Sequence, residues 1–430
     1  MINSNIRKYK SIRVRLYPNK SQEILINKTF GCCRKIYNEH LQERNEFYLN
    51  NILPIRNSAT KEELRQVWKT YKPKSEKEWK EIYPYLKEVS SQALVQSRMD
   101  CDFAFQNFYD SLLGKINKKV GFPKFKSKKE NYQHYRECTN IKLLFNEQRI
   151  SLLKLGFIKF RNNSKPKWWN QFVRVFNVTV EKTSSGKYFA AIVCEIEPRL
   201  NVIQNRKDSI GLDFSPELCY VDSDGNNAKD NFGYIPQKQA HYKQLKKLER
   251  QLSRKQKGSN NRNKARIKVA RLEEHIANCR RDWIEKETLR LVTNYDKVVV
   301  EDLNLIAISK FFKNARNLKD TSWGKFTTRL LEKSKDYNCL VIKADRFFPS
   351  SQLCSNCGYQ YHELKLYMRK WVCPSCHKEH IRDVNAAINL KNYVPQELRE
   401  SMPVEDIDAL ASLALANAEY PMKQEKQTIA

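Results

Sequence analysis

Four cysteines near the C-terminal end place the tightest local constraint on this 430-residue chain. They form two Cys-x-x-Cys pairs separated by residues 358–372: Cys354, Cys357, Cys373 and Cys376. Two such pairs at this spacing supply four thiolates in a tetrahedron, the arrangement of closed structural zinc sites. Gly358 permits a tight turn after the first pair, and His377, which tolerates positive φ better than most residues, follows the second. We therefore expect a structural Zn²⁺ ribbon at about residues 350–380.

Other interpretations of these cysteines fit less well. Four unrelated buried cysteines would not be expected to show this spacing, and a redox switch needs one thiol pair. His377 or His380 could still replace one thiol ligand. The other eight cysteines show no disulfide-framework spacing, which favours a reducing cytoplasm. They are Cys32, Cys33, Cys101, Cys138, Cys194, Cys219, Cys279 and Cys339.

The charge of the chain points to a polyanionic partner. Lys and Arg total 79 and Asp and Glu total 48, so the formal net charge is +31. Hydrophobic residues make up 40%, enough for folded cores, and no apolar run approaches the ~18 residues of a membrane helix. The chain therefore has no predicted membrane partner, and its N-terminus does not read as a signal peptide. Residues 395–430 are instead acidic, and we expect a flexible tail there.

Residues 1–205 alternate between strand and helix patterns. A strand is expected at Ser11–Tyr17, where apolar residues alternate with arginines, and a helix follows with Ser21 as its N-cap. Helical patterns continue to about Leu113. Further strands are expected at Ile141–Phe145, Phe157–Arg161, Phe172–Val180 and Tyr188–Glu197. This order predicts a β-barrel with a helical insertion at about residues 20–120.

Residues 206–394 predict an α/β domain. Short apolar strands are expected at Ser209–Leu212, Leu218–Val221, Lys297–Val300 and Cys339–Lys343. A long helical region between Lys238 and Thr293 breaks at residues 257–260. After the break, apolar residues recur at 3, 4, 3, 4 spacing, which predicts an antiparallel helical hairpin. These are Val269, Leu272, Ile276, Cys279 and Trp283.

Three carboxylates stand at the ends of these elements. Asp213 follows the strand Ser209–Leu212, Glu301 ends the strand Lys297–Val300, and Asp383 opens a helical pattern. Three such groups can hold two divalent ions that clamp the attacking and leaving oxygens of a phosphodiester. Oxygen-only ligands favour Mg²⁺ or Mn²⁺. Each residue also has a simpler explanation: a loop start, a solvated acid and a helix N-cap, respectively.

Two basic regions are candidate nucleic-acid contacts. The segment Gly121–Lys129 interleaves rings with cations, so Phe122, Lys124, Phe125 and Lys126 could stack on bases and neutralise phosphates. It could equally be a loop anchored by its two phenylalanines. The predicted helical hairpin carries many cations with few acids to offset them, and we select five as candidates. They are Arg254, Lys257, Arg262, Arg280 and Arg281.

At this point the motifs resemble a known family. The chain is similar, from about Ile12 to Asn392, to the TnpB (OrfB) nucleases of insertion sequences, which are related to compact type V CRISPR effectors. The motifs that carry the resemblance are the zinc ribbon and the segments Phe122–Lys126, Ile210–Ser215, Lys257–Arg262, His275–Asp282, Val300–Asn304 and Arg382–Asn389.

The resemblance implies a multidomain α/β protein. Its RNase H-like (RuvC-like) nuclease domain carries the long helical hairpin and the inserted zinc ribbon, and a wedge-type β-barrel with a helical recognition insertion precedes it. Asp213, Glu301 and Asp383 match the three catalytic positions. The implied partners are a guide RNA and double-stranded target DNA, with one copy of the chain on one RNA. The implied location is the cytoplasm of a prokaryote, at the nucleoid.

Two departures and three rival functions remain open. Ile381 replaces an acid that many relatives carry, and Ser215 lies where many have glycine. The rivals are a compact type V CRISPR effector, a nuclease-inactive RNA-guided DNA-binding repressor and a strand-transfer transposase. A repressor of this kind should have lost catalytic acids, whereas this chain retains all three. Nothing in the sequence identifies the residues that read the flanking motif of the target.

Overall fold

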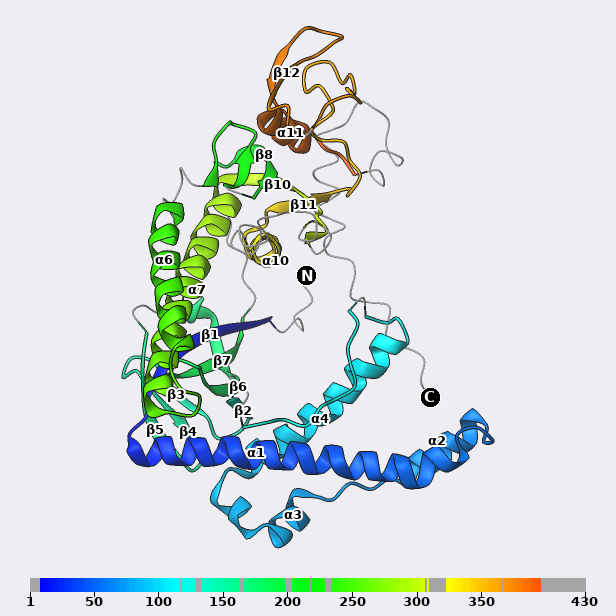
Figure 1. The fold of residues 1–430 in the computed structure, drawn as a ribbon, viewed down its shortest axis with the longest axis vertical. Helices are drawn as coiled ribbons and strands as arrows, with labels where there is room; N and C mark the ends of the chain where they lie inside the picture. Colours follow the sequence, from blue (N-terminus) through cyan, green and yellow to red (C-terminus); the bar gives the residue numbers. More distant parts are fainter. Residues whose placement is uncertain are drawn as a thin grey trace. The chain divides into compact units, whose positions relative to one another are not determined.

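The computed structural model describes residues 8–116, 118–128, 133–162, 166, 168–197, 203, 205–216, 218–228, 234–305, 308, 322–365 and 367–395. The chain divides into two compact units, Met1–Pro198 and Arg199–Ala430, each described by itself below (Figure 1). The expected acidic tail lies outside the described residues from residue 396 onward. Among the described residues, none of the helices combines the length and apolar character needed to cross a membrane.

The first unit contains a seven-stranded antiparallel sheet. Its strands are hydrogen bonded in the order β2-β6-β7-β1-β5-β4-β3, so the N-terminal strand lies in the middle. No pairing between the edge strands β2 and β3 occurs among the described residues, so the expected barrel is seen as a curled sheet. The strands are β1 (Lys8–Tyr17), β2 (Gln133–Glu137), β3 (Lys142–Leu144), β4 (Arg149–Leu152), β5 (Gly156–Arg161), β6 (Phe172–Lys182) and β7 (Tyr188–Ile196).

The central strand β1 shows why this sequence forms a sheet. Val14 and Leu16 are buried in the core, and the intervening Arg13 and Arg15 point to the other face, as period-2 alternation requires. The Arg13 guanidinium lies 3.7 Å from the centre of the Phe189 ring. It also donates to Glu181, at 2.5 Å, so Arg13 has both an aromatic and an acidic partner on the polar face of the strand.

Between β1 and β2 the described part of the chain forms four α-helices: α1 (Lys20–Phe47), α2 (Lys61–Lys69), α3 (Glu76–Ile82) and α4 (Ser91–Leu112). The expected N-cap of the first helix, Ser21, is wrong. Asn19 is the cap: it accepts from the backbone N–H of Gln22, whose side chain accepts in return from the Asn19 backbone. Ser21 falls one residue inside the helix and donates to Asn19.

The core of the first unit lies between the sheet and helices α1 and α4 (Figure 1). Apolar residues of α1 such as Ile26 and Ile36 are fully buried there together with Ile158 and Ile192 of the sheet. The helical insertion is therefore not an appendage, because two of its helices complete the core of the sheet.

The second unit contains a four-stranded sheet in the order β11-β10-β8-β9. Its strands are β8 (Lys207–Ser215), β9 (Cys219–Asp222), β10 (Tyr295–Glu301) and β11 (Leu340–Ala344). The first, third and fourth of these are parallel, and β9 is antiparallel to β8 at the edge. Parallel strands bring their carboxyl ends to the same edge of a sheet, which is where the candidate acids were predicted.

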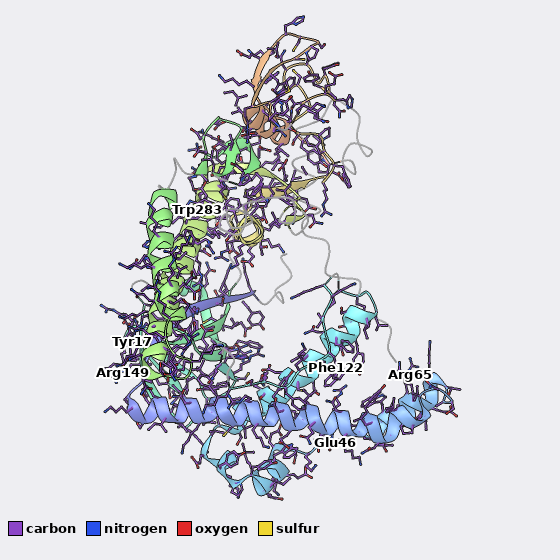
Figure 2. The ribbon with its side chains drawn as sticks, viewed as in Figure 1. Tyr17, Glu46, Arg65, Phe122, Arg149 and Trp283 are labelled. Carbon is purple, nitrogen blue, oxygen red and sulfur yellow. The ribbon has the colours of Figure 1, made fainter. Side chains whose placement is uncertain are left out.

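Helices pack against this sheet. The predicted helical hairpin is formed by α6 (Tyr234–Ser253) and α7 (Asn260–Asn294), and α10 (Trp323–Tyr337) precedes β11. Trp283 of α7 (Figure 2) stacks on Phe326 of α10, with ring centres 5.9 Å apart. The apolar seam of α7 therefore faces the sheet core at this point. Two short strands, β12 (Lys370–Val372) and β13 (Glu379–Ile381), lead into helix α11 (Arg382–Lys391).

Candidate active site and metal centres

Two acidic residues meet at the carboxyl end of the β8–β10 pair. Leu212 and Val300 are register partners, and Asp213 and Glu301 each follow directly. The two carboxyl groups are hydrogen bonded to each other. The expected end of the strand at Leu212 is wrong: β8 continues to Ser215 because it pairs with β9. Asp213 is thus held within a strand and does not begin a loop.

Helix α11 lies directly against the backbone of β8. A methyl group at Gly211 would fall 2.0 Å from the carbonyl oxygen of Ala387 and 2.4 Å from the backbone nitrogen of Lys391. Only glycine leaves room for this approach. Because Gly211 precedes Asp213 by two residues, the close crossing brings the start of α11 to the same end of the sheet.

The third predicted acid, Asp383, lies in the first turn of α11. The residue at the N-cap position is Ile381, so the simpler explanation of Asp383 as an N-cap is wrong. Its carboxylate lies 3.4 Å from the guanidinium of Arg369 and is close enough to raise the pKa of Asp213. The structure therefore brings Asp213 and Glu301 into direct contact and places Asp383, on helix α11, near enough to act on Asp213 electrostatically.

The electrostatics of the site favour a bound cation. Burial raises the pKa of Asp213 well above its usual range, and the neighbouring carboxyls of Glu301 and Asp383 raise it further. Burial also raises the pKa of Glu301. Asp213 and Glu301 repel each other when both are ionised, Asp383 adds to the repulsion of Asp213, and a divalent cation would relieve it. The oxygen-only donors fit Mg²⁺ or Mn²⁺.

One residue of the site was missed by the sequence analysis. Ser350 is buried, and its hydroxyl donates to Oε1 of Glu301 at 3.1 Å, which opposes the rise in the pKa of that carboxyl. Ser350 belongs to no motif and lies 49 positions from its partner. No local signal could have identified it.

The four predicted zinc ligands lie together in the same unit. Their sulfur atoms are all within 4.8 Å of one another, and the pairs Cys354–Cys376 and Cys357–Cys373 are both 3.6 Å apart. Sulfurs bound to one tetrahedral zinc at about 2.3 Å would be about 3.8 Å apart, so the donor set fits Zn²⁺. Gly358 and His377 both adopt positive φ, +76° and +57°, as their positions after the two pairs predicted.

His380 contacts this cluster from one side. Its Nε2 lies 3.0 Å from Sγ of Cys354, and its buried ring lies 4.8 Å from the ring of Trp371. The four thiols already complete a tetrahedral set, so the alternative of a histidine ligand has no support. Backbone and amide N–H groups, from Lys378 and Asn356, lower the pKa of Cys376 to about 6, which favours the thiolate that zinc requires.

The basic–aromatic segment of the first unit is partly a fixed loop. Phe122, beside α4 in Figure 2, makes edge-on contacts with Phe105 and Phe108 at 5.4 Å. The backbone N–H and C=O of Lys126 are both hydrogen bonded to the side chain of Asn38 on α1. Anchoring thus explains two of the four candidates, although Phe122 is still 49% exposed. The side chains of the other two, Lys124 and Phe125, are exposed.

The candidate cations of the helical hairpin also fall into two groups, one exposed and one hydrogen bonded within the hairpin. Arg254, Lys257 and Arg281 are exposed. Arg262 instead donates to the carbonyl oxygens of Leu252 and Lys255, both at 2.9 Å, and so closes the C-terminal end of α6. Arg280 donates to the hydroxyl of Tyr242, at 3.2 Å, and links the two arms. The last two therefore have structural roles that the sequence did not predict.

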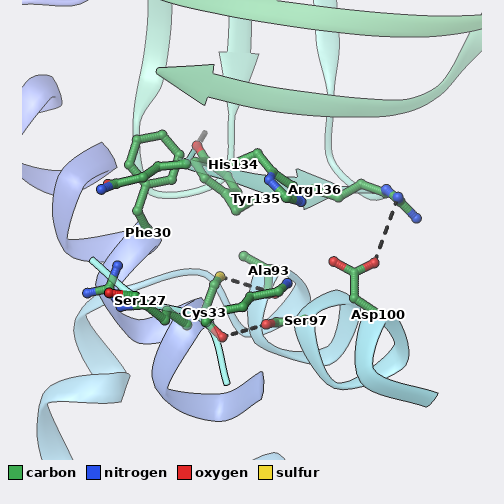
Figure 3. A pocket seen from close by; sticks show the side chains of 12 residues that line it. Phe30, Cys33, Ala93, Ser97, Asp100, Ser127, His134, Tyr135 and Arg136 are labelled. Carbon is green, nitrogen blue, oxygen red and sulfur yellow. Dashed lines mark hydrogen bonds and ion pairs between the residues drawn. The ribbon is translucent and has the colours of Figure 1, made fainter. Parts of the chain in front are cut away.

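A cavity of about 130 Å³ lies beside the basic–aromatic segment (Figure 3). Strand β2 forms one wall, through His134, Tyr135 and Arg136, and α4 forms another. Asp100 of α4 pairs with Arg136 across its rim, at 3.8 Å. Lys126 also lines it, so the cavity connects the loop to the edge of the sheet.

Comparison with known proteins decides the family. A protein of Streptomyces pristinaespiralis named "Putative RNA-guided DNA endonuclease" is 30% identical over 384 residues, which cover 89% of this chain and 88% of that one. "Putative RNA-guided DNA endonuclease InsQ" of Escherichia coli (strain K12) is 30% identical over 404 residues, covering 90% and 92%. The chain belongs to the TnpB family.

Three family models match successive parts of this TnpB-family chain. The model described as "Probable transposase" matches residues 191–311, and "Cas12f1-like, TNB domain" matches residues 323–390. A third, "Helix-turn-helix domain", matches residues 8–52. The structure there is not two helices, because β1 occupies Lys8–Tyr17 and a single long helix begins at Lys20.

The fold is also similar to that of a solved structure. The Cas12f1 chain of a Cas12f1–sgRNA–target DNA complex matches with a TM-score of 0.51 at 11% identity, covering 90% of this chain and 99% of that one. At this identity the likeness concerns the fold alone. It agrees with the expected relation between the TnpB family and compact type V effectors.

The two departures from the family pattern have different surroundings. Ile381 is exposed, at 56%, and immediately precedes α11. Ser215 is the last residue of β8, where it pairs with Cys219, and its hydroxyl accepts from the backbone N–H of Leu218. Neither residue displaces a carboxylate of the predicted triad.

Proposed function

We propose that this protein is an RNA-guided DNA endonuclease of a transposable element that hydrolyses DNA phosphodiester bonds next to a short flanking motif. The observation that carries the proposal is the convergence of Asp213, Glu301 and Asp383 at one end of a parallel sheet. The names of the two relatives at 30% identity support it.

In this proposal each acid has a defined task. Asp213 and Glu301 would hold Mg²⁺ between adjacent strands, and Asp383 would complete the ligand set from helix α11. Bound Mg²⁺ supplies activation of water for in-line attack and stabilisation of the leaving oxygen. Ser350 would hold the Glu301 carboxyl through its hydrogen bond while that carboxyl also contacts Asp213. The four cysteines would hold Zn²⁺ in a purely structural role.

Nucleic acids would occupy the basic surfaces. A guide RNA selects the target by base pairing, and the protein holds the heteroduplex through its backbone. The exposed side chains of Lys124, Phe125, Arg254, Lys257 and Arg281 are the candidate contacts. We place one copy of the chain on one RNA, in the cytoplasm of a prokaryote at the nucleoid. The net charge of +31 suits two polyanions better than one.

Three rival functions make different predictions. A type V CRISPR effector would be encoded beside a repeat array, whereas a transposon protein would be encoded inside the element ends. A nuclease-inactive repressor would bind a matched target without cutting it. A strand-transfer transposase would act on element ends without RNA. The retained triad of acids argues against the repressor.

The decisive experiment begins with purification from cells that also express the flanking DNA of the gene, followed by sequencing of the bound RNA. The complex should cut a matched double-stranded target in Mg²⁺ and leave it intact in EDTA. Full activity of RNA-free protein would contradict the guide hypothesis, and cutting that needs no divalent cation would contradict the metal site.

Substitution at the triad completes the test. Asp213→Asn should abolish cutting while target binding persists, because it removes a metal ligand and keeps the size of the side chain. Asp208→Asn is the matched control, since Asp208 is an exposed acid of the same strand. It should cut like the wild type. Cutting by Asp213→Asn at the wild-type rate would contradict the assignment of the active site.

A further inference from the structure

Helix α11 holds a short stretch of chain through a buried asparagine. Asn385 is 1% exposed; its Nδ2 donates to the carbonyl oxygen of Leu353 at 2.6 Å, and its Oδ1 accepts from the backbone N–H of Ser355 at 2.9 Å. The side chain thereby binds the backbone on both sides of Cys354, a predicted zinc ligand. We call residues 350–355 the clamp segment.

A second asparagine, one turn further along α11, holds the other end of the clamp segment. Nδ2 of Asn389 donates to the carbonyl oxygen of Ser350 at 2.8 Å and to that of Leu353 at 2.7 Å. Residues at i and i+4 lie on one face of a helix, so Asn389 and Asn385 bind the segment together. A Cys ligand thus stands at one end of the clamp segment, and the serine that contacts Glu301 stands at the other.

The second cysteine hairpin of the zinc ribbon is also connected to helix α11. His380 contacts Cys354 at 3.0 Å, and its strand β13 ends at Ile381, immediately before α11. The backbone N–H of Arg382 also donates to the carbonyl oxygen of Arg369, next to β12. The cysteine cluster is therefore joined to the start of the helix that carries Asp383.

We propose that the clamp segment and its two asparagines transmit the geometry of the zinc cluster to the active site. When zinc fixes Cys354, the segment is fixed; Ser350 then holds Glu301, and α11 holds Asp383. Ser350, Asn385 and Asn389 are positioning residues and touch no substrate. The inference rests on the proposed function, because it concerns the same three carboxylates.

The physical reason is that the zinc site and the carboxylate site differ in how freely their side chains can move. A tetrahedral zinc site leaves its ligands little freedom, whereas carboxylates without a metal repel one another and separate. A displacement of about 1 Å at a catalytic group can slow a reaction by about 10²-fold. A rigid connection between the two would keep the acids in place before the metal and the DNA arrive.

A purely structural role for the asparagines predicts something different. In that case their loss would lower the thermal stability and the amount of folded complex, and the folded fraction would cut normally. The proposal predicts a folded complex that binds target DNA with unchanged affinity and cuts it slowly. Mutation of a residue that orients a metal ligand typically lowers metal affinity or activity by about 10–100-fold. We expect a loss of activity in the same range here.

The experiment uses the full chain with its guide RNA and five variants, three tests and two controls. Asn385→Ala, Asn389→Ala and Ser350→Ala test the connection. Asn392→Ala and Ser351→Ala are matched controls, because neither side chain contributes a hydrogen bond to the clamp and Asn392 is exposed just after the same helix. For each protein we would measure bound zinc, affinity for the matched target, the cleavage rate constant and the Mg²⁺ concentration that gives half-maximal cleavage.

The expected result is that the three test variants keep one zinc per chain and wild-type affinity for the target. Their rate constants should fall about tenfold or more, with a higher Mg²⁺ requirement, and both controls should match the wild type. Wild-type rates and an unchanged Mg²⁺ requirement in all three test variants would overturn the inference. If Asp213→Asn also cut normally, the proposed function itself would fail, so the two failures are distinguishable.

A second measurement needs no cleavage. Zinc removal by a chelator, followed by hydrogen exchange with mass spectrometry, should increase exchange in α11 and at the end of β10 in the wild type. In a protein carrying both Asn385→Ala and Asn389→Ala, exchange in α11 should already be raised with zinc bound and should change less on chelation. An unchanged α11 after zinc loss from the wild type would overturn the inference.

Discussion

Gly211 of β8 lies directly under Ala387 of α11, so that a methyl group at Gly211 would stand 2.0 Å from the Ala387 carbonyl oxygen. This close crossing sets how near the start of α11 comes to Asp213. The clashing atom belongs to the helix backbone, so the clash cannot be relieved by a change of side-chain rotamer. The whole of α11 would have to move.

Gly211→Ala should therefore separate Asp383 from the other two acids. We expect cleavage to fall at least 10²-fold and unfolding free energy to fall by about 1–3 kcal/mol, the usual cost of overpacking. Gly324→Ala is the control, because its new methyl group would meet only the side chain of Leu305 at an ordinary 3.5 Å. Cleavage assays and thermal unfolding of both proteins check this, and normal cutting by Gly211→Ala would contradict it.

Stability should depend on pH through a buried acid of the first unit. Glu137 is 1% exposed, and burial raises its pKa to about 7, although the Ser90 hydroxyl donates to it. Below the unfolded pKa of 4.5 the carboxyl is protonated in both states and has no effect. Above it, the unfolded chain ionises first, so this residue lowers stability as pH rises, until about pH 7.

Glu137→Gln should remove that penalty. We expect a gain of about 3 kcal/mol over the wild type at pH 8 and little difference at pH 4.5, because a rise of the pKa from 4.5 to about 7 is worth about 1.4 kcal/mol per pKa unit. Denaturant unfolding of the two proteins at both pH values is the measurement. Equal stabilities at pH 8 would show that the carboxyl is solvated or paired in solution.

The sequence predicted those parts of the molecule that follow from local patterns. The alternation of apolar residues and arginines predicted strand β1, and the spacing of the two Cys-x-x-Cys pairs predicted the cysteine cluster. The apolar runs before Asp213 and Glu301 predicted that both acids lie at strand ends. These features depend on neighbours in the chain, so they can be read without the fold.

The remaining features depend on contacts between distant segments. The extension of β8 past Leu212 requires β9 beside it, and the role of Ser350 requires Glu301, 49 positions away. The excess of cations over acids in the hairpin predicts that Arg262 contacts nucleic acid, yet its guanidinium donates to the carbonyl groups of Leu252 and Lys255. Charge alone does not distinguish a cation that binds phosphate from one that holds a turn.

Loss of one cysteine ligand should unfold the zinc ribbon. Cys376→Ser removes a thiolate, and a structural zinc site with three thiolates binds its metal far more weakly, so we expect zinc content to fall well below one per chain. The buried ring of Trp371 would then be exposed, and proteases should cut within residues 350–380. Cys279→Ser, outside the cluster, is the control and should keep its zinc. Full zinc content in Cys376→Ser would contradict the four-cysteine site.

The two classes of hairpin arginine should differ in the dependence of RNA binding on salt. Arg254 is exposed, so if it neutralises a phosphate, Arg254→Ala should lower the slope of log affinity against log salt by about 0.7–0.9 and leave thermal stability unchanged. Arg262→Ala should instead destabilise the end of α6, by about 1–3 kcal/mol, because the Lys255 carbonyl loses its side-chain donor and the Leu252 carbonyl loses one of two donors. Its salt slope should stay near that of the wild type at temperatures where the hairpin is folded. Titration of the guide RNA at several salt concentrations, together with thermal unfolding, separates the two, and an unchanged slope for Arg254→Ala would remove it from the RNA-binding surface.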